Sequence, residues 1–80
     1  MSILAIEVEP VAVDLSFSEH SMSVRLADGR EVTIPLEWSP RLSKATTNER
    51  QNWRFIGGGV GIHWEDIDED ISVESLLRTG

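Results

Sequence analysis

Three runs of alternating apolar and polar residues follow one another between positions 11 and 36. Successive side chains of a strand point to opposite faces, so this alternation indicates strands with one buried face. Their apolar members, in chain order, are Val11, Val13, Leu15 and Phe17, then Met22, Val24 and Leu26, and finally Val32, Ile34 and Leu36. The first half of the chain is therefore predicted to form a small antiparallel β-meander with these residues turned toward the core.

The turn between the second and third runs decides their register. A two-residue turn at Asp28-Gly29 would mix apolar and polar residues on one face, which burial of that face forbids. A three-residue loop over residues 27–29, with Gly29 in the left-handed position, keeps the faces separate. The pairs that this loop predicts are Leu26–Arg30, Arg25–Glu31, Val24–Val32, Ser23–Thr33 and Met22–Ile34.

The turn between the first two runs, residues 18–21, fits a four-residue loop. It places Val13 opposite Leu26 on the buried face and Asp14 opposite Arg25 on the exposed face. The remaining predicted pairs are Phe17–Met22 and Leu15–Val24. Cross-strand pairs of this kind stabilise a sheet by roughly 0.2–1 kcal/mol each, so we interpret the charged pair as a surface contact.

The first nine positions add an apolar, strand-like run over residues 3–8, and Pro10 ends it. This run has no basic residues before it and is broken by Glu7, so we expect neither a signal peptide nor a membrane span. The chain has no cysteine, which removes disulfides and cysteine-based zinc sites and fits a reducing compartment. We expect one cytoplasmic domain over residues 1–80.

The middle of the chain carries two helix-start signals. Ser39 followed by Pro40 predicts a serine cap and a short helix from Pro40 to about Ala45. Thr46 with a glutamate three residues later has capping-box spacing, which predicts a second helix from Thr47 to Asn52. Four basic residues lie on or beside these helices, namely Arg41, Lys44, Arg50 and Arg54.

A glycine-rich segment, residues 57–61, follows between two short apolar runs. Strands over Arg54–Ile56 and Ile62–Trp64 joined by a tight glycine hairpin are the expected structure. Phosphate binding is not favoured, because no lysine completes a Walker loop and Ile62 occupies the third glycine position of a dinucleotide fingerprint.

Next comes a run of carboxylates that we name the acidic turn, residues 65–70, containing Glu65, Asp66, Asp68, Glu69 and Asp70. Its aspartates copy the first three ligand positions of an EF-hand, but Ile71 and Leu77 replace the glycine and the final glutamate. His63-Trp64-Glu65 contains the His-x-Glu of zinc deaminases without their cysteines. We predict no metal, cofactor or catalytic site, and expect an acidic turn facing solvent or a partner. A last helix over Val73–Arg78, capped by Ser72, is predicted after it.

Several blocks of this sequence resemble the bacterial DUF2442 family. The matching blocks lie between Met22 and Leu77 and include Trp38, Pro40-Arg41-Leu42, Asn52-Trp53-Arg54, Ile56-Gly57-Gly58-Gly59, Gly61-Ile62-His63-Trp64 and Asp68-Glu69-Asp70-Ile71-Ser72-Val73. The resemblance implies a small α+β domain, and it carries no catalytic residues over. Short family members look like one half of two-gene bacterial modules, which implies an antitoxin-like role. Longer members add a C-terminal helix-turn-helix domain, which we expect this chain to lack because it ends at Gly80.

The net charge of the chain indicates which class of partner it can bind. Fourteen acidic against seven basic residues give a net charge of −7, which disfavours direct binding to nucleic acid. We therefore expect an α+β domain, a meander plus a glycine-rich hairpin packed on two or three short helices, that acts as a non-enzymatic protein-interaction module. Its expected partner is a small basic protein, with self-association as a further expectation. Predicted contacts are the five carboxylates of the acidic turn, Trp53, Trp64, Arg54 and the loop glycines Gly57, Gly58, Gly59 and Gly61. For the two tryptophans, packing in the core is an equally open interpretation.

Two other classes stay open at this stage. The alternative is a nucleic-acid-linked accessory or regulator component that uses Arg41, Lys44, Arg50 and Arg54 as a basic helical face. A metal-dependent enzyme built on the acidic turn is the third and least favoured hypothesis.

Overall fold

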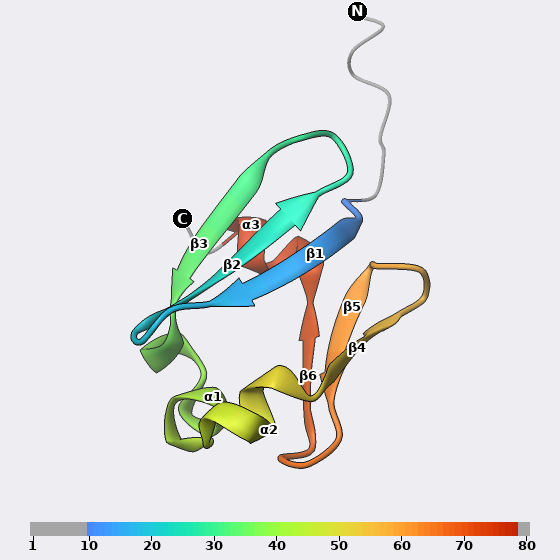
Figure 1. The fold of residues 1–80 in the computed structure, drawn as a ribbon. Coiled ribbons are helices and arrows are strands. Elements are labelled where there is room, and N and C mark those ends of the chain that lie inside the picture. Colours follow the sequence, from blue (N-terminus) through green and yellow to red (C-terminus); the bar gives the residue numbers. More distant parts are fainter. Residues whose placement is uncertain (1–9, 79–80) are drawn as a thin grey trace, which may run out of the picture.

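The computed structural model describes residues 10–78, which form two three-stranded antiparallel sheets and three short α-helices (Figure 1). The α+β class is therefore confirmed. The elements, in chain order, are β1 (Ala12–Phe17), β2 (Ser21–Leu26), β3 (Glu31–Pro35), the 3-10 helix η2 (Leu36–Trp38), α1 (Pro40–Lys44), α2 (Thr47–Gln51), β4 (Trp53–Ile56), β5 (Gly61–Trp64), β6 (Glu69–Ser72) and α3 (Val73–Arg78). The strand-like run predicted over residues 3–8 lies outside the described residues.

The first sheet has the order β1-β2-β3 and confirms the predicted register of its second hairpin. Val24 pairs with Val32 and Arg25 with Glu31. Gly29 has a φ of 96°, which is the left-handed conformation that the three-residue loop requires. The Leu26 amide donates to the Arg30 carbonyl at 2.8 Å and closes the loop.

The start of β1 corrects one prediction. Val13 was expected on the buried face opposite Leu26, but the strand has a register shift there and Ala12 takes that place. Ala12 is 2% exposed and Val13 is 51% exposed. The cause is distant in sequence, because the Ala12 amide donates to the Gly59 carbonyl at 2.8 Å. Holding Ala12 inward against the glycine loop leaves Val13 as the extra residue of a β-bulge.

The second sheet has the order β4-β5-β6, and its third strand was not predicted. The β4–β5 hairpin closes through Gly57, Gly58 and Gly59, whose φ angles are 62°, 75° and 115°. Glu69 and Asp70, which were assigned to an acidic turn, begin β6 instead. In β6 they pair with Trp64 and His63 of β5.

The caps behave as predicted, while the helix ends shift slightly. Ser39 Oγ accepts from the Leu42 amide, and Thr46 forms a complete capping box with Glu49. α1 ends one residue before Ala45 and α2 one residue before Asn52, and α3 has its predicted bounds. Leu36 was expected in a strand but begins η2, since β3 ends at Pro35, which has no amide hydrogen to continue the ladder.

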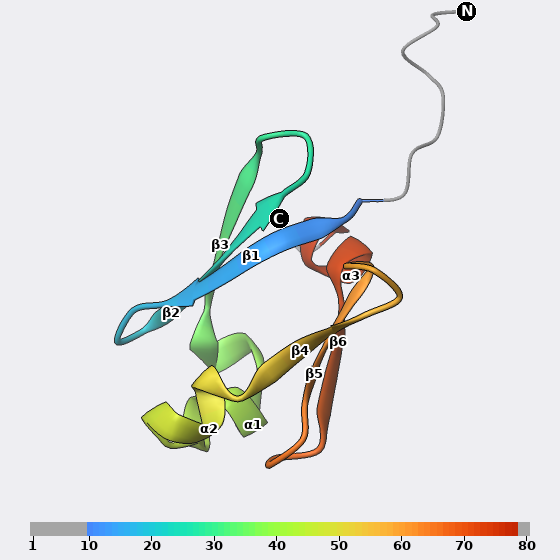
Figure 2. The same cartoon turned by 45° about the vertical axis from the view of Figure 1, so that its right-hand side comes forward.

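The core lies between the two sheets and takes residues from both. α1 and α2 join the sheets at one end, and α3 follows β6 at the other (Figures 1 and 2). The most deeply buried large side chains are Trp64, Leu42, Ile62, Val24 and Val73. Within residues 10–78, no helix is long and apolar enough to cross a membrane.

Candidate functional site

The outer face of the second sheet carries a row of charged side chains. Strand register places Arg54, His63 and Asp70 side by side on β4, β5 and β6. His63 Nδ1 is hydrogen-bonded to Asp70 Oδ1, and its Nε2 lies 3.1 Å from Glu65 Oε1. The bond to Asp70 is the main reason that the pKa of His63 is raised above its ordinary value.

The carboxylates of this row have partners within the chain. Arg54 Nη2 lies 3.6 Å from Glu65 Oε1, so Glu65 contacts both Arg54 and His63. The His63 side chain is only 14% exposed, whereas Glu65 and Asp70 are mostly exposed. The row therefore contributes to the sheet and leaves little unpaired charge for a partner.

The other three carboxylates of the acidic turn have no cationic partner among the described residues. Asp66 Oδ2 accepts from Asn52 Nδ2 at 2.9 Å, and Glu69 Oε2 accepts from Ser39 Oγ at 2.7 Å. Asp68 is exposed and has a left-handed backbone, with a φ of 52°. Within residues 10–78, the acidic turn thus has two carboxylates that contact Arg54 or His63 and three without a cationic partner.

Three of the four basic residues predicted as a helical face form bonds within the fold. Arg41 donates to the carbonyls of Ile67 and Asp68, at 3.1 and 2.7 Å, and so ties α1 to the acidic turn. Arg50 Nε donates at 2.8 Å to the carbonyl of Leu42 at the end of α1. Lys44 is exposed on α1. Two of the four basic side chains are therefore bonded to backbone carbonyls and a third, Arg54, to Glu65.

The two predicted aromatic contacts are buried to different degrees, and a third tryptophan is exposed. Trp64 is 0% exposed and donates to the Arg50 carbonyl at 3.0 Å, so it packs in the core, which was the alternative to a partner contact. Trp53 is half-buried against Phe55, with ring centroids 4.9 Å apart. Trp38, which was not among the predicted contacts, is 52% exposed.

The loop glycines also differ in their exposure. Gly57 and Gly58 are exposed, and Gly61 is half-buried within β5. Gly59 is buried against β1, and a Cβ at this position would collide with the carbonyl oxygen of Ala12. Its role is therefore close backbone packing rather than contact with a partner.

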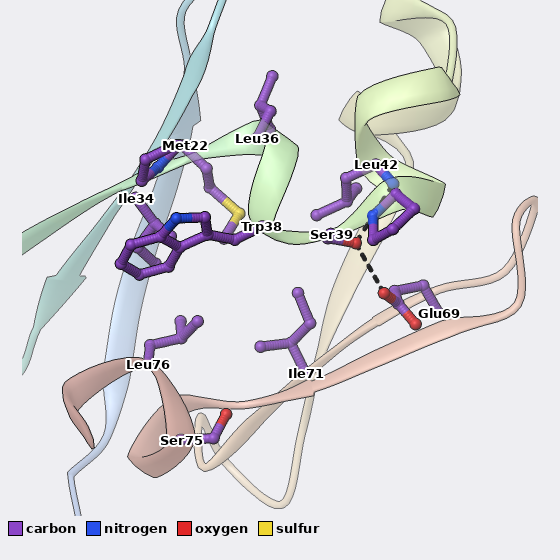
Figure 3. Close-up of a pocket in the computed structure, with 12 residues that line it drawn as sticks. Met22, Ile34, Leu36, Trp38, Ser39, Leu42, Glu69, Ile71, Ser75 and Leu76 are labelled. Atoms are coloured by element: carbon purple, nitrogen blue, oxygen red, sulfur yellow. Dashed lines mark hydrogen bonds between the residues drawn. The ribbon is translucent and has the colours of Figure 1, made fainter. Parts of the chain in front are cut away.

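A pocket of about 240 Å³ lies between η2–α1 on one side and β6–α3 on the other. Figure 3 shows Trp38 at one end and the Ser39–Glu69 hydrogen bond at the other. Most of the lining is apolar, from Met22, Ile34, Pro35, Leu36, Trp38, Pro40, Leu42, Ile71 and Leu76, with Ser39, Ser75 and Glu69 as its polar members. Glu69 is thus a half-buried carboxylate in an apolar pocket, and sequence reasoning had placed it on a solvated turn.

The lining and size of this pocket do not match those of a metal site or of a site for a drug-sized ligand. Within residues 10–78, no three His, Asp or Glu side chains are grouped so that they could hold a metal ion. The pocket is also smaller than the roughly 300–1,000 Å³ typical of sites for drug-sized ligands. Its size and lining suit a single side chain.

Comparison with known proteins gives a family and a fold. The model of the DUF2442 family, described as a protein of unknown function, matches residues 12–80. A crystal structure of a protein of unknown function from Rhodospirillum rubrum is 26% identical, with a TM-score of 0.79 over 90% of this chain and 89% of that one. A solution structure of an uncharacterized protein from Chromobacterium violaceum is 21% identical, with a TM-score of 0.72 over 85% of this chain and 64% of that one, and it shows the fold alone. No curated protein matches.

Proposed function

The chain belongs to the DUF2442 family, and we propose that it is a non-enzymatic protein-interaction module whose partner is a small basic protein. One observation carries this proposal. The half-buried Glu69 carboxylate lies at one end of an apolar pocket whose other end is formed by the half-exposed Trp38, and its one bond within the described residues comes from a neutral hydroxyl. A carboxylate with no cationic partner among the described residues, in a pocket that also has an exposed aromatic ring, is the combination that a basic partner fits.

The remaining charge of the chain supports the same partner. The net charge is −7, and Asp66 and Asp68 on the acidic turn also lack a cationic partner among the described residues. Long-range attraction of this sign speeds the encounter with a basic protein and weakens as salt is added. The acidic turn therefore steers the partner, and the pocket beside it gives the contact its specificity.

The biological role that we propose is antitoxin-like. Resemblance to short members of the family, which look like one half of two-gene bacterial modules, makes the product of the adjacent gene the expected partner. The chain would act by covering the functional surface of that protein. This mode of action requires a stable complex and no catalytic step.

Co-expression of the tagged full chain with the product of the adjacent gene tests the proposal. Purification followed by size-exclusion chromatography with light scattering is expected to give a defined hetero-complex. Neutralising the turn with Asp66→Asn and Asp68→Asn should slow association and reduce its salt dependence. Glu19→Gln is the control, because Glu19 is also exposed but lies in the β1–β2 loop. A chain that elutes alone, with no co-purifying product, would refute the proposal.

A further inference from the structure

We propose that the pocket between η2–α1 and β6–α3 receives an arginine side chain from the basic partner. This inference rests on the proposed function and names the contact through which the partner is held. It depends on three features of the pocket, which are its apolar walls, its single carboxylate and its small size.

The walls suit the aliphatic part of a long cationic side chain. Leu76 of α3, Ile71 of β6 and the indole of Trp38 surround the space that Figure 3 shows between the two halves of the site. Trp38 is 52% exposed, so this end of the pocket reaches the surface. Long basic side chains bury their methylene stems along apolar surface while the charged head reaches a polar group.

The carboxylate supplies that polar group. Ionised glutamate has two oxygens that can accept about four hydrogen bonds, and Ser39 Oγ provides one to Oε2. Arg41 is close in the fold, but its guanidinium is bonded to the carbonyls of Ile67 and Asp68 and makes no ion pair with Glu69. Glu69 therefore keeps most of its hydrogen-bond accepting capacity, with no cationic partner among the described residues.

Arginine fits this site better than other occupants. A purely apolar side chain would cover the Glu69 carboxylate without supplying a counter-charge, which is unfavourable. A lysine ammonium is more strongly hydrated than a guanidinium, which can also stack on an aromatic ring. The volume of about 240 Å³ favours one side chain over a larger molecule.

A purely structural role for Glu69 makes a different prediction. In that role Glu69 only links β6 to α1 through Ser39, and a neutral glutamine would accept the same hydrogen bond. In the arginine-binding role the negative charge itself is required. Glu69→Gln separates the two, because it keeps the size and the acceptor oxygen while removing the charge.

The experiment titrates the isotope-labelled full chain with Nα-acetyl-arginine amide and follows the amide and indole signals by NMR. Nα-acetyl-citrulline amide is the matched probe, because it has nearly the same shape without the charge. Arginine amide is expected to shift the Trp38 indole and the Ser39 and Glu69 amides, with a Kd at least about tenfold lower than that of the citrulline probe. Glu69→Gln should abolish this preference, while Asp70→Asn, on the opposite face of the same strand, should keep it.

Three results would overturn the inference. The citrulline probe could bind equally well, Glu69→Gln could bind arginine like the parent chain, or the shifts could centre on Asp66 and Asp68 rather than on the pocket. Trp38→Ala provides a second check, since loss of the exposed ring should weaken arginine binding even if Glu69→Gln folds poorly. Absence of arginine binding combined with a stable hetero-complex would remove the pocket mechanism and leave the proposed function standing.

Discussion

Glu69 and Asp70 are adjacent carboxylates at the start of β6, yet they lie in opposite environments. Asp70 faces outward and is bonded to His63 in a row that also contains Arg54 and Glu65. Glu69 faces the pocket and accepts one bond from the neutral Ser39 hydroxyl. The difference follows from strand geometry, because neighbouring side chains of a strand point to opposite faces.

The outer row and the inner pocket therefore have different roles. Charges that are balanced within the chain stabilise the sheet and offer little to a partner, whereas a charge without an internal counter-ion is available for binding. Substitutions on the two faces of the second sheet should accordingly affect different measurements.

The largest effect is expected for the buried ring of the inner face. Trp64→Ala removes a fully buried side chain and its hydrogen bond to Arg50, and should lower the free energy of unfolding by about 3–5 kcal/mol. Ile56→Ala, on the outer face and 39% exposed, should cost only about 1 kcal/mol. Urea unfolding followed by circular dichroism measures both. Equal losses would show that the two faces are not packed as described.

The glycine loop should show the next largest effect, because it holds the second sheet against β1. Gly59→Ala places a Cβ against the Ala12 carbonyl at a φ of 115°, and should cost about 3 kcal/mol. Gly58→Ala, with a φ of 75° and open space around it, should cost about 1 kcal/mol. Thermal unfolding of the two variants under identical conditions tests this. A Gly59→Ala protein as stable as Gly58→Ala would contradict the close backbone approach.

Two helix caps allow an effect on stability to be distinguished from an effect on binding. Ser39→Ala and Thr46→Ala each remove a cap and should lower the free energy of unfolding by about 1 kcal/mol. Ser39 also bonds to Glu69, whereas Thr46 is not among the residues lining the pocket. Only Ser39→Ala should therefore change arginine binding as well as stability. Identical arginine binding by both variants would show that Ser39 does not contribute to the site.

The smallest expected effect is the pH dependence of the outer row. The bond to Asp70 raises the pKa of His63 above 6.5. The stability that protonated His63 adds to the folded chain is therefore complete below about pH 6.5 and is lost as the pH rises through the raised pKa. Asp70→Asn should flatten this part of the stability profile, while Glu69→Gln should leave it unchanged. Urea unfolding across that pH range measures the slope. A steeper loss of stability with rising pH in Asp70→Asn than in the parent chain would contradict the pairing of His63 with Asp70.

The elements predicted well from sequence are those set by local signals. The β2–β3 register followed from alternation and a glycine turn, and Ser39 and Thr46 marked their helices by cap chemistry alone. The bulge at Val13 could not be predicted, because it depends on a contact with Gly59 more than forty residues away. The feature of the fold that could not be predicted was therefore one that depends on residues far apart in the chain.

The candidate site was hidden for a related reason. β6 begins with two carboxylates, so the alternation that identified the earlier strands is missing where Glu69 points inward. Trp38 belongs to a three-residue 3-10 helix, which is too short to show a periodic pattern. The pocket forms only when these two segments meet. A polar residue on an inward-facing strand position is the kind of local conflict that functional sites produce.

The most direct test is the affinity of the chain for the product of the adjacent gene, measured for the Glu69→Gln and Asp70→Asn variants. The two substitutions change neighbouring residues by the same chemistry and differ only in the face on which they act. We expect Glu69→Gln to raise the Kd about tenfold or more and Asp70→Asn to leave it close to that of the parent chain. Equal effects of the two variants, or no binding by the parent chain, would contradict the account.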